Sequence, residues 1–150
     1  MFTSSSRVAV FTFPFGTHAA PLLHLVRGLA ALAPHVKFSF FGTSESNNSI
    51  FSGSKPFEFD NIKPYNVWDG IPDGHVLTGN KHLEAMRLFI KATPDNFVKA
   101  VKEAEEDVGI KISCLLTDAF LWFACDLAEQ IGVPWVPFWT AASCSLSSHL

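Results

Sequence analysis

Two residues that lie far apart in the sequence have the side chains needed for acid–base chemistry. His18 and Asp118 each follow directly on a predicted strand. A carboxylate that accepts a hydrogen bond from the Nδ1–H of a histidine fixes the tautomer of the ring and stabilises the imidazolium, which leaves Nε2 to take a proton from a hydroxyl. We therefore interpret His18 as a general base with Asp118 as its partner. The alternative is a packed turn histidine and an aspartate that caps a helix.

The segments around His18 predict a strand, a tight turn and a helix. Residues 8–13 are apolar, with the β-branched and aromatic content of a buried strand. Apolar residues then recur at helical spacing over residues 18–33, with Thr17 as a possible N-cap. This order puts the turn at the carboxyl end of the first strand, where open α/β sheets bind ligands.

The rest of the chain continues the alternation of strands and helices. We expect further strands at residues 36–41, 61–65, 112–117 and 133–138, and helices at 45–51, 81–91, 94–106 and 121–131. Pro64 indicates a strand at the edge of the sheet or its end, and the apolar run 112–117 is typical of a strand inside a parallel sheet. The predicted fold class is α/β, a Rossmann-like parallel sheet with flanking helices.

Composition narrows the classes of protein to which the chain can belong. The 150 residues suit one domain, and 48% of them are hydrophobic, which is enough for a sizeable core. The net charge is −3 without a basic block, which argues against nucleic acid or an anionic membrane surface as a partner. The apolar run 8–15 is too short to span a bilayer and contains Pro14.

The cysteines and the missing motifs add further limits. Three cysteines without a CxxC pair (Cys114, Cys125 and Cys144) favour reduced thiols, and we expect a cytoplasmic protein. Gly16 is the only glycine in the first turn, so that neither GxGxxG nor a P-loop is present, and no GxSxG elbow occurs. His24 is six residues after His18, a spacing that does not suit a pair of metal ligands on one helix face.

Several side chains could line a pocket near the predicted turn. Six aromatic residues lie at or just beyond predicted strand ends: Phe13, Phe15, Phe120, Trp122, Phe138 and Trp139. Core packing would explain most of them, but several at one sheet edge would also suit a flat aromatic ligand. His75 and His82 lie in or beside the long loop at residues 66–80, where they could line a pocket or face water.

The combination of segments resembles a known family. Residues 8–23, with Phe13-Pro14-Phe15-Gly16-Thr17-His18 at their centre, are similar to the N-terminus of plant family 1 UDP-sugar glycosyltransferases, and more narrowly of the flavonoid (anthocyanidin and flavonol) 3-O-glucosyltransferases. Further matches occur in the same order and spacing at residues 38–41, 61–63, 69–74, 114–123 and 137–141. The family's acceptor glutamine has no clear match at residues 80–84.

The resemblance implies a fold and a reaction. Residues 1–150 would be the N-terminal, acceptor-binding domain of a GT-B fold, incomplete and without the C-terminal UDP-sugar domain. The reaction would be inverting 3-O-glucosylation of anthocyanidins or flavonols by UDP-glucose, in anthocyanin and flavonoid biosynthesis, with no cofactor and no metal. The expected partners are the flavonoid acceptor and the UDP-sugar, without stable membrane insertion, and no oligomeric state is predicted.

The same resemblance implies roles for individual residues. His18 would deprotonate the acceptor hydroxyl, with Asp118 as its charge-relay partner. Thr17 and Thr140 would contact the donor sugar. The acceptor-binding positions, besides His18, would be Phe13, Gly16, Phe120 and His149.

The end of the chain suggests a longer protein. It stops at Leu150 just after an aromatic, apolar stretch, and we expect the isolated 150 residues to have no transferase activity. Two alternatives remain open. One is a related UDP-glycosyltransferase that acts on another small phenolic or a terpenoid acceptor. The other is a non-catalytic domain that binds a small molecule.

Overall fold

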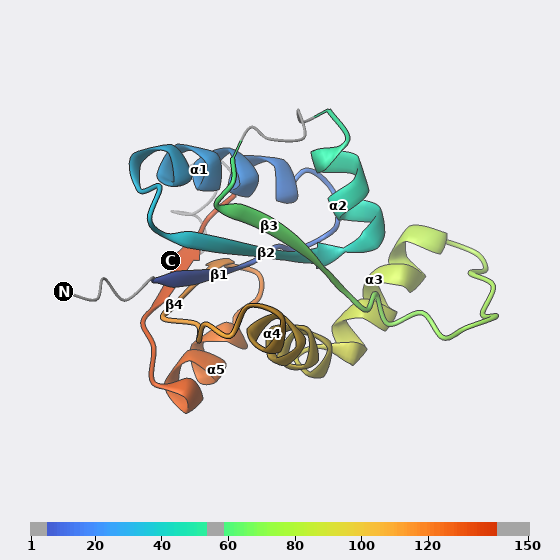
Figure 1. Cartoon of the computed structure of the whole chain (residues 1–150). Helices are drawn as coiled ribbons and strands as arrows, with labels where there is room; N and C mark the ends of the chain where they lie inside the picture. Colours follow the sequence, from blue (N-terminus) through green and yellow to red (C-terminus); the bar gives the residue numbers. More distant parts are fainter. Residues whose placement is uncertain (1–5, 54–58, 141–150) are drawn as a thin grey trace.

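A five-stranded parallel sheet forms the centre of the fold. The computed structural model describes residues 6–53 and 59–140. Within these ranges the strands lie in the order β3-β2-β1-β4-β5, and every neighbouring pair is parallel (Figure 1). The strands are β1 (Arg7–Phe11), β2 (Lys37–Thr43), β3 (Ile62–Val67), β4 (Cys114–Asp118) and β5 (Trp135–Phe138). The predicted α/β class with a parallel sheet is confirmed.

Helices cover both faces of the sheet. The helices are α1 (Ala19–Leu32), α2 (Ser44–Phe51), α3 (Lys81–Ala92), α4 (Asp95–Val108) and α5 (Ala124–Ile131). Figure 1 shows α1 and α2 on one face and α4 and α5 on the other. Each face has its own hydrophobic core: Val10 and Phe40 pack with α1 on one side, and Phe11 and Phe97 pack with α4 on the other. This division follows from the alternation of side chains along β1 and β2.

The positions of β3 and β4 confirm two expectations. β3, which contains Pro64, is the edge strand beside β2, and the apolar β4 lies between β1 and β5. Proline has no backbone N–H to donate. It is tolerated in an edge strand because one side of that strand has no neighbouring strand to accept a hydrogen bond. The adjacency of β1 and β4 matters for the site, since His18 lies beyond the turn after β1 and Asp118 is the last residue of β4.

Some predicted boundaries were wrong. β1 ends at Phe11 rather than residue 13, and α1 begins at Ala19 with His18, not Thr17, as its N-cap residue and no side-chain cap. Gly16 has a φ of 62°, so the backbone turns between strand and helix before Thr17 can act as a cap. α5 begins at Ala124, three residues later than predicted, because turns that hydrogen-bond to Asp118 intervene.

A buried arginine joins β1 to the far end of α4. Arg7 is 1% exposed and donates hydrogen bonds to the carbonyls of Ala104 and Ile110, each at 2.9 Å, and to Ser39 Oγ at 2.8 Å. Its Nη2 also donates to the Tyr65 hydroxyl at 3.3 Å. A buried charge needs such partners, and this network fixes α4 against the sheet.

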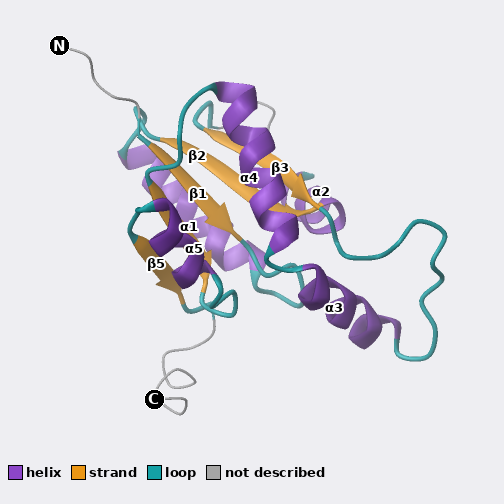
Figure 2. Cartoon of the chain, turned by 90° about the horizontal axis from the view of Figure 1, so that it is seen from below, coloured by secondary structure: helices purple, strands orange, loops and turns teal. Residues whose placement is uncertain are grey.

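The segment between β3 and α3 extends from the body of the molecule. Figure 2 shows α3 and the preceding loop projecting beyond the sheet. Gly70, with a φ of 83°, packs so closely on α3 that a Cβ there would collide with the carbonyl of Leu88. The start of the loop therefore packs against the second half of α3. Within the described residues, no helix has both the length and the apolar character needed to cross a membrane.

Candidate active site

Strand register brings His18 and Asp118 together. β1 and β4 pair in parallel with Phe11 opposite Thr117, so that the next residue, Asp118, ends β4 level with the turn that follows β1. His18 is at the start of α1 above this turn. The predicted proximity of the two residues, which are 100 positions apart, is therefore a consequence of neighbouring parallel strands that end at the same edge.

The hydrogen bonds around Asp118 define the geometry of the pair. His18 Nδ1 lies 2.8 Å from Asp118 Oδ2, and the backbone N–H of Phe120 donates to Asp118 Oδ1 at 2.8 Å. Asp118 is fully buried, whereas the His18 side chain keeps 21% of its surface exposed. A buried carboxylate needs donors at both oxygens. The alternative of a helix-capping aspartate does not fit, since Asp118 is the last residue of β4 and α5 begins six residues later.

This arrangement determines which nitrogen can act as a base. A carboxylate oxygen at 2.8 Å from Nδ1 accepts a hydrogen from that nitrogen. Nε2 then carries the lone pair of the neutral ring. The pair has the composition and geometry of a base held by a carboxylate, which can remove a proton from a hydroxyl and stabilise the resulting imidazolium.

An aromatic cavity of about 540 Å³ lies beside the pair. This volume is within the range of roughly 300–1,000 Å³ that is usual for small-molecule sites. The ring of His18 forms part of its wall and lies 5.1 Å from the Phe13 ring and 4.6 Å from the Phe120 ring, between centroids. A chain of rings continues from Phe13 to Phe15 at 5.3 Å and from Phe15 to His82 at 5.6 Å. Such a wall suits a flat aromatic ligand.

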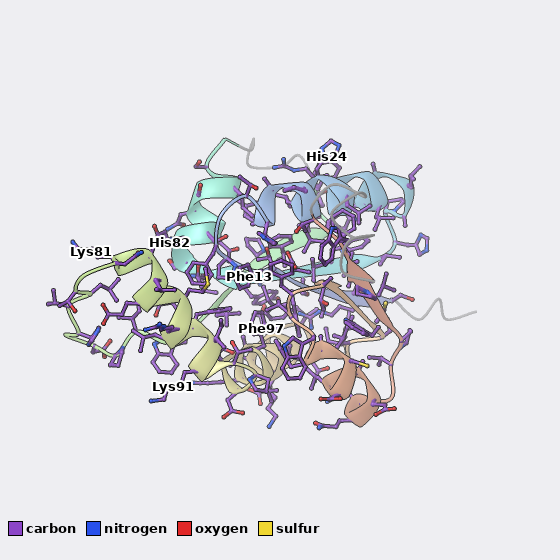
Figure 3. All side chains as sticks on the ribbon, turned by 180° about the vertical axis from the view of Figure 1, so that it is seen from behind. Phe13, His24, Lys81, His82, Lys91 and Phe97 are labelled. Carbon is purple, nitrogen blue, oxygen red and sulfur yellow. The ribbon has the colours of Figure 1, made fainter. Side chains whose placement is uncertain are left out.

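Helix α3 supplies the opposite wall of the cavity. His82, Met86, Phe89 and Ile90 line it from successive turns of the helix. Figure 3 shows Phe13 and His82 on the same side of the molecule, with His24 far from them on α1. Sequence reasoning left His82 open between a pocket and solvent, and it missed Met86, Phe89 and Ile90. Their spacing of four, seven and eight residues along a helix beside the long loop was the available signal.

The predicted site residues do not all lie at the cavity. Phe13, Gly16, His18 and Phe120 line it, as do Phe15 and Trp122. Thr17 is exposed in the turn before α1 and is not among the residues of the cavity wall. Phe138, for which core packing and a pocket were both open, is partly buried and packs against the core on the α1 face. His149, proposed for the acceptor, and Cys144 lie outside the described residues.

Thr140 lies beside the pair. Its Oγ1 is 2.7 Å from His18 Nδ1 and 3.3 Å from Asp118 Oδ2. Trp139 precedes it and places its ring 5.7 Å from that of Phe120. The segment that follows β5 thus adds the Thr140 hydroxyl to His18 and Asp118 at the same edge of the sheet.

The loop before α3 is tied to the helix by Glu84. Glu84 accepts hydrogen bonds from the backbone N–H of Thr78 at 2.7 Å and makes a second contact with His75 Nε2 at 2.8 Å. These two donors, the Thr78 N–H first, hold the pKa of Glu84 below its usual value. The carboxylate therefore fixes the loop next to the helix that lines the cavity.

The described residues do not provide a metal cluster. Over residues 6–53 and 59–140, no group of three or more His, Cys, Asp or Glu side chains is placed to hold a metal ion.

Comparison with known proteins identifies relatives over nearly the whole chain. No protein-family model matches it. An anthocyanidin 3-O-glucosyltransferase of Gentiana triflora is 62% identical over 97% of this chain and 32% of its own length. A flavonol 3-O-glucosyltransferase of Actinidia chinensis var. chinensis is 57% identical over 95% of this chain and 31% of its own. The chain thus spans about a third of the length of these relatives.

Solved structures agree with this result. A UDP-glucose:anthocyanidin 3-O-glucosyltransferase crystallised with UDP superposes with a TM-score of 0.89 at 40% identity, over 97% of this chain and 32% of that one. The Medicago truncatula UGT71G1 complex with UDP-glucose, at 18% identity and a TM-score of 0.64, supports the fold alone. The five-stranded sheet is therefore that of the N-terminal part of GT-B glycosyltransferases. Over nearly its whole length the chain is homologous to the N-terminal third of flavonol and anthocyanidin 3-O-glucosyltransferases.

Proposed function

We propose that residues 1–150 form the acceptor-binding domain of a UDP-glucose-dependent 3-O-glucosyltransferase of flavonols and anthocyanidins. A second domain, like that of the longer relatives, would bind the UDP-sugar. The observation that carries the proposal is the hydrogen bond of 2.8 Å between His18 Nδ1 and Asp118 Oδ2 at the wall of an aromatic cavity. The names of the relatives support the choice of substrates.

The proposed mechanism is a single displacement. The 3-hydroxyl of the acceptor gives its proton to His18 Nε2, and its oxygen attacks the anomeric carbon of glucose. The bond to UDP breaks on the opposite face, so that the configuration inverts. Asp118 stabilises the imidazolium that forms, and UDP leaves with the electron pair of the broken bond. The reaction uses UDP-glucose as co-substrate and requires neither a cofactor nor a metal.

The cavity supports a planar, largely apolar acceptor. Most of its lining residues are apolar or aromatic, and His18, His82 and Thr93 are the main polar side chains in its wall. An aromatic acceptor that stacks along Phe13 and Phe15 would bring one end to His18. Such a site gains affinity from apolar burial and orientation from a few polar groups.

The test uses the full-length protein, meaning the polypeptide that carries this chain together with the part its relatives have beyond it. Incubation with UDP-glucose and quercetin should yield the 3-O-β-glucoside, identified by NMR of the purified product. Glucose on a different hydroxyl of quercetin would contradict the proposed 3-O transfer. Transfer only to non-flavonoid phenolics or terpenoids would favour a related UDP-glycosyltransferase with another acceptor. Saturable flavonol binding by the full-length protein without any transfer would favour a binding domain.

A further inference from the structure

The hydroxyl of Thr140 contacts both members of the His18–Asp118 pair. Thr140 follows β5, whose last residue, Phe138, is opposite Asp118 in the sheet register. This register brings Thr140 Oγ1 to 2.7 Å from His18 Nδ1 and 3.3 Å from Asp118 Oδ2. We propose that Thr140 is a positioning residue that holds His18 in the tautomer and orientation in which Nε2 is the base. This inference rests on the proposed function of His18.

The hydrogens in this triangle can be assigned from the distances. If Nδ1 lacked a hydrogen, its lone pair would face a carboxylate oxygen at 2.8 Å, which is repulsive. Nδ1 therefore carries the hydrogen, and this hydrogen faces two acceptors, Asp118 Oδ2 and Thr140 Oγ1. The hydroxyl of Thr140 then gives its own hydrogen to Asp118 Oδ2 at 3.3 Å. The Nδ1 hydrogen and the Thr140 hydroxyl hydrogen together account for the three contacts among His18, Asp118 and Thr140.

The opposite tautomer, with the ring hydrogen on Nε2, leaves a buried acceptor without a donor. If the Thr140 hydroxyl donated to Nδ1, the ring would carry its hydrogen on Nε2 and could not accept a proton there. Asp118 Oδ2 would then face a lone pair inside a site where it is fully buried. The Thr140 hydroxyl therefore supports the productive tautomer when its oxygen accepts from Nδ1 and its hydrogen is donated to Asp118 Oδ2. Two contacts at Nδ1 also restrict rotation of the His18 ring, whose side chain is 21% exposed.

Nuclear magnetic resonance of the ring tests the proposal without relying on glucosyl transfer. In full-length protein labelled with ¹⁵N-histidine, the His18 signals are assigned by their loss in His18→Ala. Thr140→Val keeps the shape of the side chain and removes the hydroxyl. Because Nδ1–H then has one acceptor instead of two, its proton resonance should move downfield, whereas Thr140→Ser should keep the wild-type position. A signal at the wild-type position in Thr140→Val overturns the proposal.

Thr17→Val is the matched control. Thr17 is the neighbouring residue of His18 in the sequence and is exposed in the turn. We expect its loss to leave the Nδ1–H signal of His18 unchanged. A shift of equal size in Thr17→Val would show a general disturbance of the turn and would overturn the assignment to Thr140.

Kinetics of the same variants separate positioning from contact with the donor sugar. We expect Thr140→Val to reduce kcat about tenfold, by the usual scale for a hydrogen bond to a charged group, and to displace the acid limb of the pH–rate profile. In an Asp118→Asn background the same change should have little further effect, because residues that act through one network are not additive. A change confined to KM for UDP-glucose, with an unchanged pH profile, would make Thr140 a sugar contact only. If the wild type transfers no glucose, the proposed function fails, and the resonance of His18 still decides the role of Thr140.

Discussion

His18 Nδ1 and Asp118 Oδ2 lie 2.8 Å apart because β1 and β4 are parallel neighbours that end at one edge of the sheet. The distance is set by strand register and by the turn at Gly16, neither of which depends on a ligand. The pair is therefore formed before substrate binds. Such a preformed base and carboxylate avoid reorganisation at the moment of proton transfer.

Removal of the imidazole should abolish most of the activity. In the full-length protein, His18→Ala is expected to lower kcat by roughly 10²–10⁴-fold, which is the usual contribution of a general base. KM for UDP-glucose should change little, and circular dichroism should show an intact fold because His18 packs no core. Near-normal turnover of the variant would remove His18 from the mechanism and favour the binding-domain alternative.

Replacement of the carboxylate tests the tautomer argument. Asp118→Asn preserves the shape of the side chain, but its amide can present a donor to Nδ1 and so favour the ring with hydrogen on Nε2. We expect a loss of kcat on the order of 10²–10⁴-fold. Thermal unfolding checks the fold, since Asp118 is fully buried and the Phe120 N–H still needs an acceptor. A variant that folds and retains activity would reduce Asp118 to a structural residue of the turn.

Phe120 offers a test of the acceptor cavity. Its ring contacts those of Phe13, His18 and Trp139 but remains 48% exposed, so that truncation should cost little stability. Phe120→Ala should raise KM for the flavonol about tenfold, from the loss of one aromatic contact, with KM for UDP-glucose nearly unchanged. Leu32→Ala removes an 85% exposed apolar side chain on α1 and serves as the control. Equal effects of the two substitutions would argue against an acceptor site at this cavity.

Much of the architecture was predictable because it depends on local patterns. The alternation of apolar strands with helical periods gives the α/β class, and Pro64 marks the edge strand. The ends of elements were less predictable: α1 begins one residue later than expected because Gly16 turns the backbone, and α5 begins late because Asp118 accepts hydrogen bonds from the turn before it. Those causes lie in tertiary hydrogen bonds, which no local pattern contains.

The site was predictable only in part for the same reason. His18 and Asp118 could be paired because each follows a strand. The α3 wall, with Met86 and Phe89, depends on how the loop at residues 68–80 returns the chain across the sheet edge, and a sequence does not specify such a path. Thr140 was named through resemblance as a contact of the donor sugar, whereas its hydrogen bonds to His18 and Asp118 follow from the register of β5.

The buried Arg7 predicts a large effect on stability. Arg7→Met would leave the buried carbonyl of Ala104 and the partly buried carbonyl of Ile110 without their donor. We expect the free energy of unfolding to fall by about 3 kcal/mol, the upper part of the range for hydrogen bonds to a charged group. Urea unfolding measures the difference, and Lys102→Met, at an exposed cation on α4, is the control. A loss for Arg7→Met as small as that of the control would show that the network adds nothing to stability.

Glu84 predicts a pH dependence of the loop. The pKa of Glu84 is lowered first by the backbone N–H of Thr78 and then by His75, so the folded state favours the ionised carboxylate. A group with a lowered pKa stabilises the structure above its unfolded value, about 4.3 for glutamate, and this stabilisation is lost as pH falls through the lower folded value. The protection factor of the Thr78 amide, which is the factor by which its exchange is slowed relative to that of an unstructured amide at the same pH, should therefore be high at neutral pH and fall on acidification below about pH 4.

Substitution of the carboxylate should remove this behaviour. In Glu84→Gln the Thr78 amide is expected to have a lower protection factor at neutral pH, with little further loss on acidification. The control Glu106→Gln, whose carboxylate lies on the exposed face of α4, should keep the wild-type pH dependence. Because Glu84 is on the same helix as His82 and Met86, the looser loop should also raise KM for the acceptor a few-fold. Exchange at Thr78 that is equally slow in wild type and Glu84→Gln would mean that contacts such as that of Gly70 with α3, rather than Glu84, hold the loop.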